Sequence, residues 1–379
     1  MKYKICFALT SRADFSLAYP VINQFKRNSK FKVSVISSGY LSGKLYGKKI
    51  DLIKKKIKKI DLEIKNYPSE DTALSITHSL SEGIIEFSKY FEKFKPDYLF
   101  VFADKFEMLC PVISSVQYKI PICHVEGGDL TEGALDDNIR HAITKFSHLH
   151  FVSTKEYKKR LIQLGEEPWR ILVSGSPSLD LIQGMKFLRK SDLNQKFNFD
   201  FEKEFILCTF HPVTNDLDNT NKYMENLINS LKKQNKSNII FTSPNADLTS
   251  SKIKQKIKNF SKKFSNIKYL DKLEYNEYLS LMRHCKFMIG NSSSGIIESA
   301  TVKTKVVNIG NRQKGRVIPK NVITCGYSEN EILHAISKIK KIKKKFNNPY
   351  FKKNVSKKIY DFFIRKLNKD IVNKKFVDI

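Results

Sequence analysis

Short apolar runs alternate with amphipathic stretches in the first half of the chain. The runs that predict strands are residues 4–9, 32–37, 98–103, 120–125, 149–152 and 171–173. Between them, apolar residues recur at helical spacing in residues 19–27, 72–94, 107–118, 138–146 and 155–164. Continuously apolar strands separated by helices are typical of a parallel sheet covered by helices on both faces.

The pattern weakens over the polar residues 183–203 and then resumes. Further strands are predicted at residues 205–210, 238–242, 267–270, 287–290 and 305–309. We therefore predict an α/β protein with two Rossmann-like doubly wound domains facing a central cleft. Their expected ranges are 1–182 and 204–355, and residues 356–379 are expected to form a helix that crosses back to the first domain.

The formal net charge of +30 over 379 residues raises the question of a nucleic-acid partner. The lysines are scattered along helical stretches, and no aromatic-basic nucleic-acid motif accompanies them. We therefore interpret them as a solvated surface and predict no nucleic-acid partner. Attraction of an anionic substrate, or adhesion to an acidic membrane surface, stays open as an alternative.

The six cysteines are widely spaced and form no C-x-x-C pair. This favours reduced thiols in a cytoplasmic protein over a disulfide framework or a zinc site. The first ten residues already have the pattern of a strand and not of a signal peptide. No apolar run reaches the roughly 18 residues of a membrane span, so none is predicted.

Carboxylates gather just after a predicted strand in residues 124–150. Within a dozen residues the segment contains Glu126, Asp129, Glu132, Asp136 and Asp137. Another acid, Asp104, follows the strand at 98–103. If these two strands are neighbours, Asp104 and Glu126 lie only several ångströms apart, given a strand spacing of roughly 4.8 Å. Crowded carboxylates can divide into one protonated and one ionised group. Helix capping by Asp104, Asp136 or Asp137 is the structural alternative.

Other polar residues also follow predicted strands, where open parallel sheets bind ligands. Arg12 follows the first strand and could hold an anion, or could be exposed beside a capping Asp14. There is no G-x-G-x-x-G dinucleotide fingerprint. His211 follows the strand at 205–210, and its role could be structural or functional. Ser243 follows the strand at 238–242.

A cluster of small residues follows the strand at 287–290. Ser292, Ser293 and Gly295 precede a helix expected to start near Ile296, with Glu298 in its first turn. Such a helix start can cradle a phosphate, or can simply be a capped helix. After the strand at 305–309, a basic loop containing Arg312 is suited to an anion. Phosphate-binding features are thus expected in the second domain and carboxylates in the first.

Several of these segments together resemble a known family. The motifs are T-S-R-A-D-F at 10–15, A-D-K-F-E at 103–107, H-V-E-G-G at 124–128, L-D-D-N-I-R-H-A-I-T-K at 135–145, G-S-P-S-L-D at 175–180, H-P-V-T at 211–214, G-N-S-S-S-G-I-I-E at 290–298 and N-I-G-N-R-Q-K-G-R at 308–316. They resemble the UDP-N-acetylglucosamine 2-epimerases, specifically the hydrolysing branch of sialic and legionaminic acid pathways. The resemblance extends from about residue 4 to about residue 327.

The resemblance implies a fold like that of the GT-B glycosyltransferases, with no metal and no nicotinamide cofactor. It implies proton abstraction at carbon 2 of a nucleotide sugar, loss of the nucleotide to give a 2-acetamidoglycal, and addition of water. The catalytic residues that it implies are Asp104, Glu126, one of Asp136 and Asp137 (Asp136 slightly favoured), and His211. The nucleotide and diphosphate contacts that it implies are Arg12, Ser292, Ser293, Glu298 and Arg312, and we add Ser243 and Gly295 to the candidate site. A homodimer or homotetramer is also implied.

Two departures from the family pattern concern the substrate. Lys105 stands where the family commonly has Arg, and Tyr40 stands where a His is usual. Lys keeps the charge but loses the bidentate fork of Arg. Neither UDP nor GDP is favoured by the sequence alone.

The alternatives to a hydrolysing epimerase are a GT-B glycosyltransferase and, from another class, a basic binding protein. Asp129 and Glu132 receive no role, and His141, His148 and His150 are interpreted as structural.

Overall fold

The computed structural model describes residues 2–42, 53–54, 56–70, 72–244, 250–343, 346–367 and 370–378, and of Arg12 only the backbone. The chain divides into two compact units. The first unit is Met1–Asp129, Asp136–Gln183 and Tyr350–Ile379, and the second is Leu130–Leu135 and Gly184–Pro349. The chain therefore passes between the units at 183/184 and 349/350, and residues 130–135 group with the second unit.

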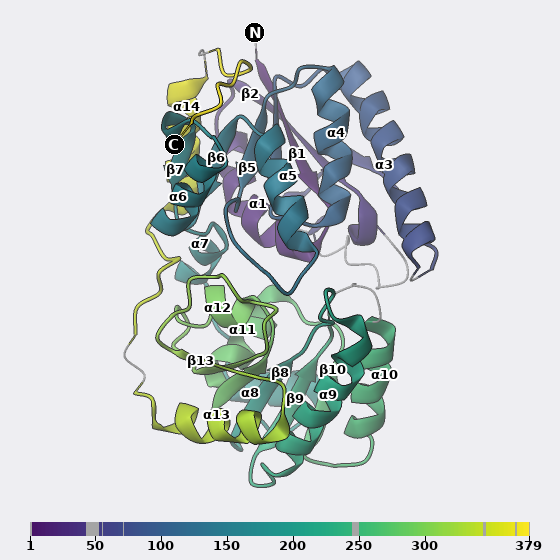
Figure 1. The fold of residues 1–379 in the computed structure, drawn as a ribbon, viewed down its shortest axis with the longest axis vertical. Helices are drawn as coiled ribbons and strands as arrows, with labels where there is room; N and C mark the ends of the chain where they lie inside the picture. Colours follow the sequence, from purple (N-terminus) through teal and green to yellow (C-terminus); the bar gives the residue numbers. More distant parts are fainter. Residues whose placement is uncertain are drawn as a thin grey trace. The chain divides into compact units, whose positions relative to one another are not determined.

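Within the described residues, the first unit contains a seven-stranded parallel sheet (Figure 1). Its strands are β1 (Tyr3–Leu9), β2 (Phe31–Ser37), β3 (Leu62–Glu63), β4 (Tyr98–Phe102), β5 (Ile122–Val125), β6 (Leu149–Val152) and β7 (Ile171–Val173). Their order is β3-β2-β1-β4-β5-β6-β7, so the direction of winding reverses between β1 and β4. Every residue of β4 and β5 is buried, which explains why these strands read as unbroken apolar runs.

Helices cover this sheet in two groups. They are α1 (Arg12–Lys26), α3 (Ala73–Phe94), α4 (Leu109–Gln117), α5 (Asp136–Phe146), α6 (Lys155–Gln163), α7 (Ser178–Gln183) and α14 (Val355–Lys366), with single 3-10 turns at Gly39–Leu41, Phe106–Met108 and Pro168–Arg170. Helix α1 contacts α7 and α14, whereas α3 packs beside α4, and α4 contacts α5. The last long helix of the chain thus belongs to the unit that contains the first strand.

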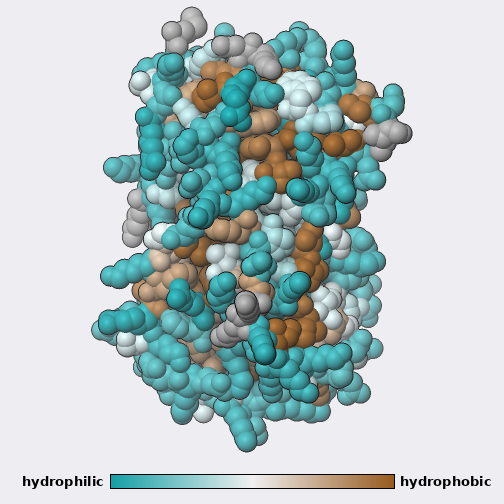
Figure 2. All heavy atoms as spheres, turned by 90° about the vertical axis from the view of Figure 1, so that its left-hand side faces the viewer, coloured by the Kyte–Doolittle hydropathy of each residue, from teal (hydrophilic) through white to brown (hydrophobic). Residues whose placement is uncertain are grey.

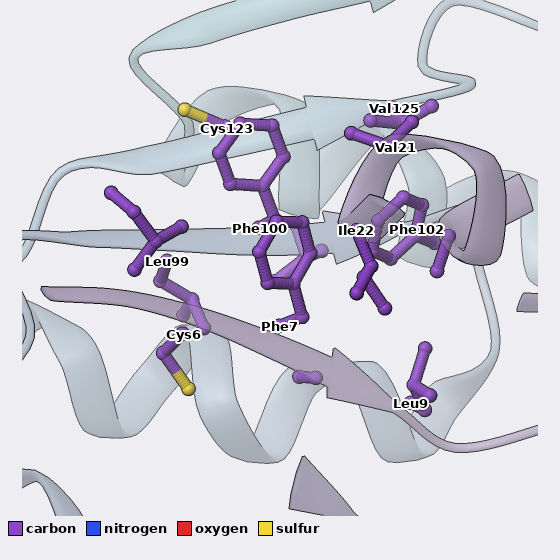
Figure 3. Close-up of a cluster of buried hydrophobic side chains, with 14 of the residues drawn as sticks. Cys6, Phe7, Leu9, Val21, Ile22, Leu99, Phe100, Phe102, Cys123 and Val125 are labelled. Carbon is purple, nitrogen blue, oxygen red and sulfur yellow. The ribbon is translucent and has the colours of Figure 1, made fainter. Parts of the chain in front are cut away.

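Aromatic side chains fill the core of the first unit (Figure 3). Phe7 of β1 stacks on Phe100 of β4, with ring centroids 4.9 Å apart. Phe25 of α1 and Phe363 of α14 meet Phe100 at their ring edges or at a tilt. Because these rings come from both ends of the chain, this core depends on α14 as well as on the first strands.

The second unit contains a six-stranded parallel sheet within the described ranges. Its strands are β8 (Phe205–Thr209), β9 (Asn238–Thr242), β10 (Ile267–Leu270), β11 (Phe287–Gly290), β12 (Val306–Ile309) and β13 (Val322–Cys325), in the order β10-β9-β8-β11-β12-β13. Its helices are α8 (Lys190–Phe197), α9 (Leu217–Lys232), α10 (Ser250–Ser261), α11 (Tyr275–His284), α12 (Ser294–Ile297) and α13 (Glu329–Lys341). The predicted α/β class with two doubly wound parallel sheets is confirmed.

Lysine-rich helices turn their charges outward. In α13 the buried side chains are Ile332, Ala335, Ile336 and Ile339, at helical spacing, and the lysines between and after them are exposed. Figure 2 shows a face on which hydrophilic residues predominate, with smaller hydrophobic patches between them. None of the helices in the described ranges is long and apolar enough to cross a membrane.

Candidate functional site

Two predicted acids of the first unit follow neighbouring strands. Strands β4 and β5 pair in parallel, with Phe102 opposite Val125. Asp104 comes two residues after β4, and Glu126 comes directly after β5. Ala103 and Glu126 both have left-handed backbone conformations, with φ of 57° and 69°, so the chain turns sharply at each strand end. The condition for the two carboxylates to lie at one edge of the sheet is therefore met.

A buried arginine joins the acids around this edge. The Arg140 side chain is 1% exposed and donates from Nε to Asp104 Oδ2 at 2.9 Å. Its Nη1 donates to Asp137 Oδ1 at 3.0 Å and to the Asp129 carbonyl at 2.9 Å. Burial lowers the pKa of Arg140, but the Asp104 and Asp129 carboxylates outweigh this effect and raise the pKa above its ordinary value. Asp104 and Asp137 are thus held by one charged guanidinium.

The adjacent acids Asp136 and Asp137 have different partners. Helix α5 begins at Asp136 and not at residue 138, so both acids lie in its first turn, where the helix dipole favours negative charge. Asp136 Oδ1 lies 3.2 Å from Lys105 Nζ, whereas Asp137 is bound by Arg140. The sequence alone did not decide between Asp136 and Asp137. In the structure they differ in their partner, which is a flexible lysine for Asp136 and a rigid arginine for Asp137.

His124 supports the turn that precedes Asp104. Its buried ring lies with Nε2 2.9 Å from the Ala103 carbonyl and Nδ1 3.2 Å from Thr144 Oγ1. Burial lowers the pKa of His124 to about 3, so the ring is neutral, donates from Nε2 and accepts at Nδ1. A side chain at Gly127 would meet this ring and Thr144 Oγ1, so the Gly-Gly step leaves room for it. Glu126 Oε2 in turn accepts from Ser153 Oγ at 2.5 Å.

At the first strand end, the capping interpretation of Asp14 is confirmed. Helix α1 begins at Arg12, with Ser11 as N-cap, and Ser11 and Asp14 form a capping box. Asp14 is fully buried and accepts hydrogen bonds from the backbone and hydroxyl groups of Thr10 and Ser11. The side chain of Arg12, the predicted anion contact, lies outside the described part of the structure.

In the second unit, His211 lies where the winding direction of the sheet reverses. Strands β8 and β11 are neighbours, with Thr209 opposite Gly290. His211 follows β8 and is 4% exposed, and Asn291 follows β11 and is fully buried. The Asn291 side chain accepts from the His211 backbone N–H at 2.7 Å and donates to the His211 carbonyl at 2.9 Å. This is the position at which doubly wound sheets bind ligands.

Hydroxyl groups cluster after β11, and the helix expected there starts earlier than predicted. Ser294 Oγ lies 3.0 Å from Ser292 Oγ and 2.5 Å from the Tyr278 hydroxyl. Helix α12 is a single turn with Ser293 as its N-cap, and Glu298 is its C-cap instead of a first-turn residue. The backbone closes into turns at this point, where Ser299 N–H donates to the Ser294 carbonyl. Gly295 is buried, and a side chain there would press on Val306 of β12.

The basic loop after β12 reaches the same strand ends. Arg312 is 6% exposed and its Nη1 lies 3.4 Å from the Asn291 carbonyl, which also accepts from Gln313 Nε2 at 2.9 Å. Ser243 directly follows β9 and accepts a hydrogen bond from the Tyr269 hydroxyl at 3.2 Å. The structure therefore gathers His211, Ser292 and Arg312 around Asn291, and it ties Ser243 to a different partner.

Arg140, His124 and Asn291 were not predicted as site residues. Arg140 had a signal, because it lies one helical turn after Asp137 and can bind it. His124 and Asn291 had no such local signal, because their partners, mainly backbone groups, are distant in the sequence and only the fold brings them near.

Comparison with known proteins places this arrangement in a family. Residues 23–364 match the family described as UDP-N-acetylglucosamine 2-epimerase. A GDP/UDP-N,N'-diacetylbacillosamine 2-epimerase (hydrolyzing) of Campylobacter jejuni is 39% identical over 323 residues, which cover 85% of this chain and 84% of the relative. A polysialic acid biosynthesis protein of Escherichia coli is 32% identical, and the match covers 99% of this chain and 97% of the relative.

Solved structures agree with the fold. The UDP-GlcNAc 2-epimerase of Methanocaldococcus jannaschii, solved in complex with UDP-GlcNAc and UDP, superposes with a TM-score of 0.81. It is 18% identical, and the match covers 96% of this chain and 99% of that one. The glycosyltransferase alternative is not favoured by any of these matches, although the GT-B-like fold is shared. The chain belongs to the UDP-N-acetylglucosamine 2-epimerase family.

Proposed function

We propose that this protein is a hydrolysing nucleotide-sugar 2-epimerase. The observation that carries the proposal is the set of acids joined by Arg140 at the ends of β4 and β5, in a chain 39% identical to a hydrolysing 2-epimerase. The substrate class is a UDP- or GDP-linked 2-acetamido sugar. The products are the free sugar with inverted configuration at carbon 2, of the N-acetylmannosamine type, and the nucleotide.

The proposed reaction has two steps. A base removes the proton from carbon 2, the C–H electron pair forms a C1=C2 double bond, and the C1–O bond breaks so that the nucleotide leaves. Water then adds to the resulting 2-acetamidoglycal and places its oxygen on carbon 1. A proton is delivered to carbon 2 on the face opposite to the one from which the first proton was removed. Both steps need positioned acids and bases, and groups that stabilise charge at carbon 1.

The acids of the first unit are suited to different parts of this work. Glu126 bonds to the neutral hydroxyl of Ser153 and is half-buried, so we assign it proton transfer at the sugar. Asp136, bonded to the flexible Lys105, is assigned the second proton transfer. Asp104 and Asp137 both bond to Arg140, which holds them in place at the strand ends, so we assign them the stabilisation of positive charge at carbon 1.

In the second unit we assign nucleotide binding to the strand ends around Asn291. The hydroxyls of Ser292 and Ser293 and the guanidinium of Arg312 suit a diphosphate, and the Glu298 carboxylate suits ribose hydroxyls. Arg12, Ser243 and Gly295 remain proposed contacts, and His211 is proposed as an acid for the departing phosphate. Neither a metal nor a redox cofactor takes part in the proposed reaction.

The relatives narrow the proposed substrate and pathway. One relative acts on GDP/UDP-N,N'-diacetylbacillosamine and another takes part in polysialic acid biosynthesis. We therefore propose a diacetamido sugar nucleotide as the first candidate, UDP-N-acetylglucosamine as the second, and a place in nonulosonic acid biosynthesis. We further propose that the protein is cytoplasmic. We also propose that it is a homodimer or homotetramer, which light scattering of the purified protein would test.

The function is tested by NMR of the purified protein with UDP-N-acetylglucosamine and with UDP- and GDP-linked diacetamido sugars. The expected result is release of the nucleotide and a free 2-epimer that carries deuterium at carbon 2 when the reaction runs in heavy water. If none of these substrates releases its nucleotide, the proposal is wrong.

The role of Glu126 is tested by Glu126→Gln, which keeps the shape of the side chain and removes its acid-base chemistry. Turnover should fall by roughly 10²-fold or more. The control is Glu132→Gln, because Glu132 is an exposed loop acid paired only at the surface with Lys314. A near-normal rate for Glu126→Gln would remove Glu126 from the mechanism.

A further inference from the structure

Asn291 joins the loops that follow three neighbouring strands of the second unit. Through its side chain it bonds both backbone polar groups of His211, which follows β8. Through its own carbonyl it accepts hydrogen bonds from Gln313 Nε2 and Arg312 Nη1, which follow β12. Asn291 itself follows β11 and is fully buried, so water does not compete for these bonds.

The geometry explains why an amide occupies this position. The Asn291 backbone N–H donates to the Thr209 carbonyl at 3.1 Å, which ends the backbone ladder between β11 and β8. The residue after His211 is Pro212, which has no N–H with which to continue a ladder. The Asn291 side chain supplies one acceptor and one donor and so takes the place of the next strand residue. A carboxylate or a hydroxyl of similar size cannot serve both groups in the same way.

We infer that Asn291 is the positioning residue of the proposed nucleotide-binding residues of the second unit. It sets the backbone of His211, and hence the direction of the imidazole, together with the position of the Arg312 guanidinium. The inference rests on the proposed function, in which His211 transfers a proton and Arg312 binds the diphosphate. A single substitution at Asn291 should therefore impair both turnover and nucleotide affinity.

The test compares three variants of the full-length protein. Asn291→Ala removes both side-chain bonds, and Asn291→Asp keeps the acceptor for the His211 N–H but loses the donor. The matched control is Asn321→Ala: Asn321 is also fully buried in the second unit and donates to Ser299 Oγ at 2.8 Å and to the Thr304 carbonyl at 2.6 Å. It directly precedes β13, at the opposite end of the strands from Asn291.

Asn291→Ala should lower kcat by about 10²-fold, because a small misplacement of a reacting group has that effect. It should raise the Kd for UDP about tenfold. The kcat and the Kd for UDP of Asn291→Asp should lie between those of Asn291→Ala and wild type. The pH dependence of its kcat should also be shifted. Asn321→Ala should lower the melting temperature as much as Asn291→Ala does, but its kcat should stay within about threefold of wild type. A kcat for Asn291→Ala within about threefold of wild type, or an equal loss in Asn321→Ala, would overturn the inference.

A readout without turnover separates this inference from the proposed function. The His211 amide hydrogen should exchange about tenfold faster or more in Asn291→Ala than in wild type, and at the wild-type rate in Asn321→Ala. If wild type releases no nucleotide from any sugar, the proposed function fails, and the His211 amide still decides whether Asn291 positions His211. Unchanged exchange in Asn291→Ala would refute the positioning role whatever the activity.

Discussion

At the scale of single residues, the charge of Arg140 explains how so many acids can be crowded after β5. Its side chain is 1% exposed and meets Asp104, Asp137 and the Asp129 carbonyl. Two carboxylates in one place repel each other unless a cation lies between them. A planar guanidinium can bind several oxygens at fixed angles, which an ammonium cannot.

We predict that Arg140→Lys lowers kcat by more than about tenfold and the free energy of unfolding by about 3 kcal/mol, because two partly buried carboxylates lose the guanidinium that serves them both. The same substitution at Arg189 is the control. Arg189 bonds Asp192 through both Nε and Nη2, but its side chain is 81% exposed. The exposed pair should contribute little to stability, because solvent screens it. Steady-state kinetics measures the rate, and hydrogen exchange of amides in the unit of each variant measures the stability. A wild-type rate in Arg140→Lys contradicts the prediction.

Sequence reasoning located the residues that lie beyond strand ends, because a buried strand is visible as an apolar run. It could therefore place Asp104, Glu126 and His211 correctly relative to β4, β5 and β8. It could not find Asn291 as a joint between strands, because that role depends on β8 and β11 being neighbours although they are separated by three helices in the chain.

At the scale of elements, predictions failed where helices or strands were short. Helix α8 lies in the polar stretch 183–203, where the pattern weakened and no helix was predicted, and its single buried residue is Leu193. Strand β13 was missed because only Val322 of its four residues is buried. Helix α12 was expected to start near Ile296, but its few apolar residues, 296–297, do not determine where it begins or ends. In each case few residues carry the periodic signal, so tertiary contacts decide the outcome.

Gly290 shows how closely two elements approach at the candidate site. It ends β11 with φ of 135°, and a Cβ there would collide with the Thr209 backbone of β8. We predict that Gly290→Ala lowers the free energy of unfolding of the second unit by about 3 kcal/mol. Gly184→Ala is the control, since a Cβ at Gly184 meets nothing within 4 Å, and its effect should be small. Hydrogen exchange of amides in β8 and β11 would check this, and equal exchange rates in the two variants would refute it.

At the scale of the whole molecule, the last residues of the chain stabilise the unit that contains the first ones. Arg170 donates to the carbonyls of Ile371 and Asn373 at 2.8 and 2.7 Å. Lys374 lies 2.8 Å from Glu166, whose fully buried carboxylate also meets His150 and Lys145. Because Glu166 is surrounded by cations and one histidine, the docking of the C-terminal segment should depend on the ionisation of that carboxylate.

Burial alone would raise the pKa of Glu166, but hydrogen bonds from His150, Lys374 and Lys145 outweigh it and lower the pKa to about 2 from an ordinary value of 4.5. The folded state therefore holds the ionised form more strongly than the unfolded chain does. This contribution, about 3 kcal/mol, is fully present above pH 4.5 and is lost as the pH falls towards 2. Wild type should accordingly lose its advantage over Glu166→Gln across this range.

Hydrogen exchange measures the loss in each unit separately, which a single unfolding curve of a two-unit protein cannot do. Amides of β6 should exchange faster in Glu166→Gln than in wild type at pH 6, and this difference should shrink as the pH falls below 4.5. Amides of β9 should not differ, because His150, Lys145 and Lys374, which bind Glu166, belong to the first unit. His124, whose pKa of about 3 also lowers stability in acid, is common to both proteins and cancels in the comparison. A pH-independent difference at β6 would mean that the ionised carboxylate does not hold the C-terminal segment.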